Sequence, residues 1–198
     1  MLNTLAIFGS PRKGSNSKRI VEEILEGIKS VQGDVNIDKI FPAKEDINPC
    51  IACDGCHRKL GCVIEDDMQE LYSKFDQADI VLVASPIYFN AVSAQLKGLI
   101  DRCQAIWASK YVHKDPIIDR DKKRLGVFVA AAGNPAGIAQ FKPSQQIMEL
   151  FFKSINTDYY RDILFTNSDE NPIAERPETL EKAHQLGVKL GRDMIKER

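Results

Sequence analysis

The sequence feature that most constrains the fold is the stretch from residue 5 to residue 17, Leu-Ala-Ile-Phe-Gly-Ser-Pro-Arg-Lys-Gly-Ser-Asn-Ser. It begins as an apolar run, breaks at Gly9 and Pro11, and takes on helical spacing after Ser17. Backbone N–H groups at a helix N-terminus are unpaired and partly positive, so a strand, a glycine- and serine-rich loop and a helix can together hold an anion. An ordinary strand–turn–helix with a serine N-cap gives the same pattern. The loop matches neither the nucleoside-triphosphate P-loop nor the dinucleotide fingerprint.

The polar side chains of this loop add to its suitability for an anion. Arg12 carries a planar charged fork that matches phosphate oxygens. Hydroxyl and amide donors stand at Ser10, Ser15, Asn16 and Ser17. We therefore predict that the loop binds a phosphate group through these five residues.

Length and composition describe an ordinary globular chain. The 198 residues fit one domain, 1–198, and 43% of them are hydrophobic. The 27 basic and 28 acidic residues give a net charge of −1, which argues against a nucleic-acid partner because such proteins carry a basic excess on one face. No apolar run reaches the roughly 18 residues of a membrane span. The first eight residues are interpreted as a strand and not as a signal peptide, so we expect a cytoplasmic location.

Apolar periodicity predicts five strands that alternate with helices. Short apolar or alternating runs indicate strands, and apolar residues three and four apart indicate helices. The run 80–84, Ile-Val-Leu-Val-Ala, is apolar on both faces, as expected of a central parallel strand. The predicted strands cover 4–8, 35–40, 80–84, 125–132 and 159–165, and the predicted helices cover 17–30, 68–78, 93–107, 143–155 and a final segment from about 177.

This alternation predicts an α/β fold, a flavodoxin-like three-layer sandwich. Its five-stranded parallel sheet has the order 2-1-3-4-5, with helices on both faces. A ligand of such a sheet binds at the carboxyl ends of the strands, where the winding reverses. Three loops would meet there, at Ser10–Ser17, Pro86–Asn90 and Gly133–Gly137.

The second and third of these loops predict a wall for a flat ligand. Tyr88 and Phe89 can pack on a ring system, and backbone amides around Ile87–Asn90 and Gly133 can meet its polar edge. Core packing is the alternative for both aromatic rings, although loops that follow a strand more often carry function. The three loops together predict one crevice with phosphate donors at one end and this wall at the other.

Two motifs together resemble those of the NAD(P)H-dependent FMN reductase group of flavodoxin-like proteins. They are Gly-Ser-Pro-Arg-x-Gly-x-Asn-Ser at 9–17 and Ser-Pro-Ile-Tyr-Phe-Asn at 85–90. The resemblance implies FMN as the cofactor and NAD(P)H as a possible donor, with the FMN phosphate held by Ser10, Arg12, Asn16 and Ser17. It also implies that the isoalloxazine lies against Pro86, Ile87, Tyr88, Phe89, Asn90 and Gly133.

Members of this group are commonly dimers or tetramers, so the resemblance implies a homodimer or homotetramer with a subunit contact beside the flavin. In this chain the polar connection 109–123 contains one apolar patch, Pro-Ile-Ile at 116–118, which we predict to be an exposed subunit contact. The other partners expected are a small-molecule or protein electron donor and acceptor.

Four of the five cysteines fall within thirteen positions, in a predicted insertion loop at about 41–67. Cys50, Cys53, Cys56 and Cys62 have the spacing C-x2-C-x2-C-x5-C, and thiolates with two residues between them can wrap a single cluster. Five cysteines, an odd number, make a poor disulfide pattern. The run and the acidic stretch 65–67 after it resemble the iron–sulfur flavoproteins, a branch of the same FMN group, which implies a [4Fe–4S] cluster on these four side chains.

Three other uses of these cysteines stay open. Relatives without a cluster keep some or all of them, four thiolates also suit tetrahedral zinc, and Cys53 and Cys56 could form a redox-active pair. The fifth cysteine, Cys103, lies with Trp107 in the apolar stripe of the predicted helix 93–107, so we predict a core thiol. His57 is predicted to be a solvated loop residue.

The predicted function is that of an oxidoreductase that moves electrons between a reduced donor and an acceptor through FMN and the cluster. Because the cofactors carry the chemistry, no catalytic side chain is named. One alternative is an NAD(P)H-dependent FMN or quinone reductase without a cluster. A second alternative is a non-enzymatic FMN- or metal-binding interaction module.

Overall fold

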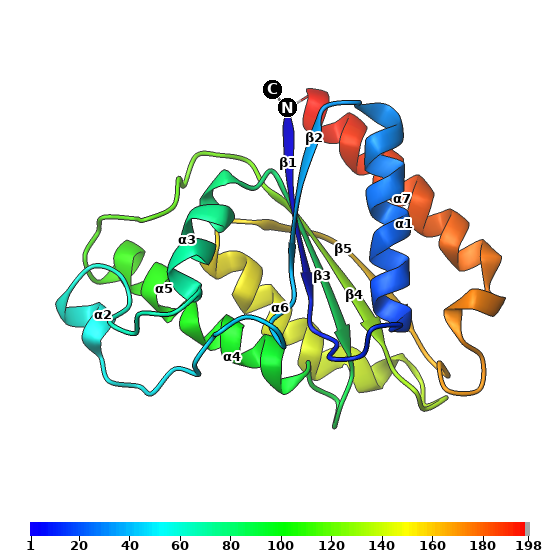
Figure 1. Ribbon diagram of the computed structural model, residues 1–198, viewed down its shortest axis with the longest axis horizontal. Coiled ribbons are helices and arrows are strands. Elements are labelled where there is room, and N and C mark those ends of the chain that lie inside the picture. The colour runs from blue at the N-terminus through cyan, green and yellow to red at the C-terminus, as the bar shows by residue number, and fades with distance from the viewer. Residues whose placement is uncertain (197–198) are drawn as a thin grey trace.

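The computed structural model describes residues 1–196 and contains a parallel sheet of five strands (Figure 1). The strands lie in the order β2-β1-β3-β4-β5, and every adjacent pair is parallel. The predicted flavodoxin-like fold and its strand order are therefore confirmed, with β5 at an edge. The strands are β1 Leu2–Phe8, β2 Val35–Ile40, β3 Ile80–Pro86, β4 Leu125–Ala131 and β5 Asp158–Phe165.

Helices cover both faces of the sheet (Figure 1). Helices α1 and α7 pack together on one face, and α3 to α6 lie on the other side, with the short α2 at the far edge of that layer. No helix of residues 1–196 is both long and apolar enough to cross a membrane. The helices are α1 Asn16–Val31, α2 Gly55–Arg58, α3 Met68–Gln77, α4 Ala94–Arg102, α5 Gln104–Tyr111, α6 Lys142–Ser154 and α7 Pro177–Lys196, and two short 3-10 turns cover Ile138–Phe141 and Ile173–Glu175.

The alternation of side chains along the strands builds two separate cores. In β1, Leu5 and Ile7 point to the layer of α3 to α6, whereas Ala6 and Phe8 point to α1 and α7. Successive side chains of a strand point to opposite faces, so apolar residues at both sets of positions require a helix layer on each side. Because the strands are parallel, their carboxyl ends all lie at one edge of the sheet, and the loops that follow them there are not packed into either core.

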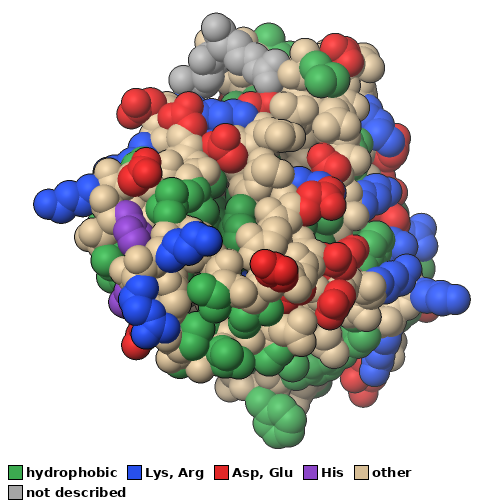
Figure 2. Space-filling model, turned by 60° about the vertical axis from the view of Figure 1, so that its left-hand side comes forward, with side chains coloured by type: hydrophobic (Ala, Val, Ile, Leu, Met, Phe, Trp, Pro, Cys, Tyr) green, Lys and Arg blue, Asp and Glu red, His purple; other side chains and the backbone are tan. Residues whose placement is uncertain are grey.

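Two details of the second helix layer differ from the sequence prediction. The predicted helix 93–107 is two helices, because Cys103 has a ψ angle of −2° and its amide bonds to Ile100 O at 3.0 Å, which ends α4. Trp107 therefore leaves the buried stripe and is 40% exposed beside an apolar groove between the α4–α5 pair and α6. Figure 2, which brings this side of the molecule forward, shows hydrophobic side chains among the charged ones on its lower half.

The prediction that the apolar patch 116–118 is exposed is also wrong in part. Ser109 anchors this loop, because its carbonyl oxygen accepts the amide of Asp115 at 2.9 Å and its Oγ accepts the amide of Ile117 at 3.1 Å. The loop therefore turns inward, and Ile118 is buried in the core. Only Pro116 of the three residues is exposed.

Helices α1 and α7 approach closely where two glycines face each other. A Cβ on Gly187 would overlap the carbonyl oxygen of Ile24, and one on Gly27 would overlap the carbonyl oxygen of His184. Both obstacles are backbone atoms, which cannot rotate away as a side chain can. A side chain at either glycine would therefore push the two helices apart.

We expect Gly187→Ala to lower the free energy of unfolding by about 1–3 kcal/mol, because overpacking of this kind forces backbone shifts. Gly98→Ala in α4 is the matched control, since a Cβ there meets nothing within 4 Å. The control should be neutral or more stable by about 0.5–1 kcal/mol, because alanine favours a helix interior over glycine. Urea denaturation followed by circular dichroism measures both, and equal stability of the two variants would contradict the packing described.

Candidate cofactor-binding site

The three loops predicted to meet at the carboxyl edge of the sheet do meet there, around a crevice of about 270 Å³. Nine of the eleven predicted cofactor-binding residues line it. Figure 1 shows the loops that follow β1, β3 and β4 at the same end of the sheet. The nine residues are Ser10, Arg12, Ser15, Asn16, Ser17, Pro86, Ile87, Tyr88 and Gly133.

The N-terminus of α1 forms one end of this crevice. Ser15 is the N-cap, and its Oγ accepts a hydrogen bond from the amide of Lys18 at 3.3 Å. The hydroxyl of Ser17 is buried and has no hydrogen-bond partner among the described residues. A buried hydroxyl without a partner costs about 1–3 kcal/mol, so such a group at a crevice and a helix N-terminus is suited to a ligand oxygen.

Two further residues of the loop lie at the rim of the same end. Ser10 Oγ accepts a hydrogen bond from the amide of Arg12 at 3.2 Å, which tightens the loop. The side chain of Arg12 is exposed at the rim of the crevice. A guanidinium in this position can bond to an anion held at the helix N-terminus.

Asn16 holds the crevice together and is already bonded within the protein. Its Nδ2 donates to the carbonyl oxygen of Ser168 at 3.5 Å, and its Oδ1 accepts the amide of Ile173 at 3.0 Å. These contacts draw the segment after β5 against the start of α1. Asn16 therefore shapes the wall of the crevice.

The wall at the other end of the crevice is a tight turn after β3. The amides of Ile87 and Tyr88 bond to Ala131 O at 2.8 Å and Ala91 O at 3.0 Å, so both are occupied. Phe89 and Asn90 have φ angles of 50° and 63°, the left-handed pair typical of a two-residue type I′ turn. They form the tip of the turn and do not line the crevice, and the side chain of Phe89 is fully exposed.

Three further polar residues line the crevice. Asn134 lies in the predicted loop 133–137, whereas Ser168 and Asp169 lie in a segment that sequence reasoning missed. The carboxylate of Asp169 lies directly over Gly133, so that a Cβ at Gly133 would overlap it. The amide of Ser168 bonds to Ala132 O at 3.1 Å, which fixes this segment beside the loop after β4. The polar run Asn-Ser-Asp at 167–169 follows the fifth predicted strand, and that position at the functional edge was the signal available in the sequence.

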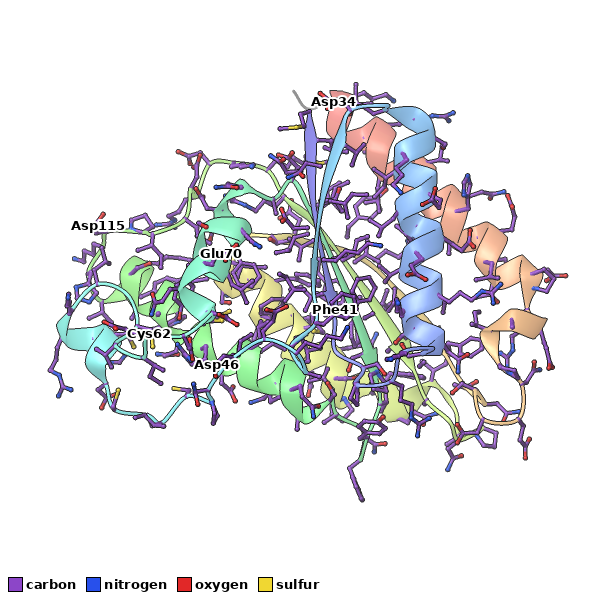
Figure 3. The ribbon with its side chains drawn as sticks, in the orientation of Figure 1. Asp34, Phe41, Asp46, Cys62, Glu70 and Asp115 are labelled. Atoms are coloured by element: carbon purple, nitrogen blue, oxygen red, sulfur yellow. The ribbon has the colours of Figure 1, made fainter. Side chains whose placement is uncertain are left out.

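The four clustered cysteines lie in an arm of the chain, residues 48–66, that we call the cysteine segment. It extends from the sheet beside α3 and α5, and Figure 3 labels Cys62 within it. Cys50 and Cys53 are exposed, Cys56 and Cys62 are partly buried, and all are free thiols. Ala52 and Asp54, on either side of Cys53, have φ angles of 51° and 54°, which strains the backbone there.

The thiols of this segment influence one another but are not gathered into a metal site. Burial raises the pKa of the Cys56 thiol, and the nearby thiols of Cys62, Cys50 and Cys53 raise it further. Within residues 1–196 no three His, Cys, Asp or Glu side chains are grouped closely enough to hold a metal ion. The donor set itself, four soft thiols in one segment, suits iron–sulfur or zinc chemistry.

Cys103 is a core thiol, as predicted, and His57 is exposed, as predicted, although it lies in the short helix α2 and not in a loop. Cys103 is 2% exposed in the core, and burial raises the pKa of its thiol. His57 is exposed, and its Nε2 lies 3.3 Å from Nε2 of Gln104.

The fold and this crevice define a flavodoxin-like protein, and comparison identifies the family. The chain belongs to the NADPH-dependent FMN reductase family, whose model matches residues 2–160. A solved structure of similar shape is an FMN-dependent NADH-azoreductase from Bacillus anthracis str. Ames Ancestor in complex with FMN, with a TM-score of 0.73 at 16% identity, covering 96% of this chain and 100% of that one.

Two curated proteins of similar sequence are both named iron-sulfur flavoproteins. The iron-sulfur flavoprotein of Methanosarcina thermophila is 39% identical over 111 residues, which are 56% of this chain and 57% of that protein. An iron-sulfur flavoprotein of Archaeoglobus fulgidus is 33% identical over 149 residues, 74% of this chain and 70% of that protein. The chain thus spans little more than half the length of the first of these relatives.

Proposed function

We propose that this chain is an iron–sulfur flavoprotein, which holds FMN in the crevice and a [4Fe–4S] cluster on the cysteine segment. When bound, FMN accepts a hydride and releases electrons singly, and an iron–sulfur cluster carries one electron at a time. A protein with both can connect a two-electron donor such as NAD(P)H to a one-electron partner. The family and the names of the curated relatives support this assignment.

The observation that carries the FMN half of the proposal is the buried, unpartnered hydroxyl of Ser17. Ser17 is in the first turn of a 16-residue helix and lines the crevice, with Arg12 at the rim. Phosphate oxygens accept hydrogen bonds from hydroxyl, guanidinium and first-turn amide donors together. We assign the phosphate to Ser10, Arg12, Ser15 and Ser17, with Asn16 as the residue that holds the wall.

The remaining crevice residues suit the flat ring of the flavin. Pro86, Ile87 and Tyr88 present an apolar surface, and Gly133 lets the chain approach closely from the opposite loop. The carboxylate of Asp169 accepts hydrogen bonds and occupies the space over Gly133. We assign the isoalloxazine to this end, with Asp169 as an acceptor for its polar groups or for the ribityl hydroxyls.

The cysteine segment supports the cluster half of the proposal through its donor set. Cys50, Cys53, Cys56 and Cys62 supply four thiols, two of them exposed, and no disulfide consumes any of them. Two residues separate Cys50 from Cys53 and two separate Cys53 from Cys56, and thiolates at this spacing fit the chemistry of iron–sulfur clusters.

A second candidate is an FMN-dependent reductase without a cluster. The observation that favours it is the spread of the thiols, because within the described residues they are not grouped as metal ligands. Under this alternative the crevice keeps the same role, and FMN held there would supply the chemistry for reduction of a quinone or a free flavin by NAD(P)H. Iron analysis separates the two candidates.

We expect Ser17→Ala and Arg12→Ala each to bind FMN about 10- to 100-fold more weakly, the effect of one lost hydrogen bond to a charged group. Isothermal titration of FMN into the flavin-free protein measures this. The flavin-free Ser17→Ala protein should be at least as stable as wild type, because the substitution removes an unpaired hydroxyl. Lys13→Ala is the charge-matched control, since Lys13 does not line the crevice. Unchanged affinity in both test variants would remove the phosphate assignment.

We expect the protein purified or reconstituted without oxygen to contain about four irons and four acid-labile sulfides per chain. Cys53→Ser and Cys56→Ser should lose most of this iron, because each removes a ligand. Cys103→Ala, the control, should keep it, because that thiol lies in the core. Wild-type protein without iron after reconstitution would favour the cluster-free reductase.

A further inference from the structure

One buried guanidinium holds the base of the cysteine segment. Arg102, the last residue of α4, is 1% exposed. Its Nη1 donates to the carbonyl oxygen of Asn48 at 2.7 Å and to Oδ2 of Asp66 at 2.5 Å. Its Nη2 donates to the carbonyl oxygen of Ile64 at 3.2 Å and to Oδ1 of Asp66 at 2.9 Å. Arg102 therefore bonds to the chain both before the first and after the last of the four clustered cysteines.

The carboxylate of Asp66 closes the same base. It accepts the amide of Asn48 at 2.9 Å and the amide of Met68 at 3.1 Å, in addition to the bonds from Arg102. The side chains of this ion pair are both fully buried. Breaking such a pair leaves an uncompensated charge away from water, so the two ends of the segment cannot separate at low cost.

The other end of α4 is fixed to the edge of the sheet where the crevice forms. Ser93, the N-cap of α4, donates from Oγ to the carbonyl oxygen of Gly9 at 2.6 Å. Its amide donates to Oγ of Ser85 at 3.1 Å. Gly9 directly follows β1, and Ser85 is next to the last residue of β3, so both lie at the edge where the crevice forms. The nine residues of α4 give it a length of about 13 Å.

We infer that α4 is a rigid spacer between the crevice and the cysteine segment, and that Arg102 is the positioning residue that fixes the segment to it. The inference rests on the proposed function, because a constant distance between the crevice and the cysteine segment matters only if each of them holds a redox group. A site on a helix that is bonded at both ends keeps its geometry better than a site on a loop. Arginine suits this position because the two Nη atoms of its planar guanidinium bond to acceptors at both ends of the segment, whereas a lysine offers one donor nitrogen and no bidentate match to the carboxylate.

Arg102→Lys tests the inference, because it keeps the charge and removes the fork. The readout is cleavage of the iron-free protein by trypsin at Arg58 and Lys59, which are exposed within the cysteine segment. Arg58 ends the helix α2, and opening of the segment lets this backbone unfold so that trypsin can cut it, so we expect cleavage on the order of tenfold faster than in wild type. In the reconstituted protein we expect lower iron content and a shifted reduction potential of the cluster. FMN affinity should not change, since the Ser93 end of α4 is intact.

Arg124→Lys is the matched control for a general loss of stability. Arg124 is also 1% exposed, and its Nη2 donates to Oδ1 of Asp76 at 2.9 Å, outside the cysteine segment. This variant should lose stability without faster cleavage at Arg58 and Lys59 and without loss of iron. If Arg102→Lys does not fold, Asp66→Asn replaces it, because this nearly isosteric change also breaks the pair and should give the same pattern.

Cleavage of Arg102→Lys at the wild-type rate, or no faster than that of Arg124→Lys, would overturn the inference. So would a loss of FMN affinity equal to the loss of iron, since the effect would then be global. If the wild type takes up no iron, the cluster assignment fails, and the cleavage rates of the iron-free proteins still decide the role of Arg102.

Discussion

Burial of the central strands on both faces is the constraint on which the rest of the structure depends. β1, β3 and β4 carry apolar side chains at consecutive positions, and each face needs its own helix layer to remove them from water. Parallel strands covered on both sides leave only their ends open. The carboxyl ends collect the loops after β1, β3 and β4 at one edge, so the polar residues of the crevice gather there without disturbing either core.

The parts of this structure that follow from local patterns could be predicted from the sequence. The strands are apolar runs, α1 shows its buried face as Ile20, Ile24 and Ile28, and the strand order follows from regular alternation. Nine crevice residues were found because strand ends determine which loops meet. Asp169 was missed because a polar run has no periodicity that predicts its position. The direction of Phe89 was missed because Phe89 and Asn90 adopt left-handed φ angles although neither is a glycine, and the sequence therefore gives no sign of this turn.

Contacts between distant segments account for the rest. Arg102 has the sequence context of an ordinary helical arginine, and its burial depends on Asp66, 36 positions earlier in the chain. Trp107 would belong to the buried face of a continuous helix 93–107, but the helix is interrupted at Cys103, so this prediction fails. The segment that carries the four cysteines has no apolar pattern that predicts its position, which is set by a few polar contacts. The hydroxyl of Ser17 likewise depends on distant segments, because no local pattern shows that it is buried without a hydrogen-bond partner among the described residues.

The central claim is that one chain holds two redox groups, and a count of the electrons that the chain takes up tests it most directly. The measurement is an anaerobic reductive titration of the purified protein, followed by visible absorption and electron paramagnetic resonance. FMN takes two electrons and a [4Fe–4S] cluster takes one, so the account predicts about three electrons per chain, with loss of both the flavin band and the iron–sulfur absorption. Uptake of about two electrons, with a flavin spectrum alone, would contradict it.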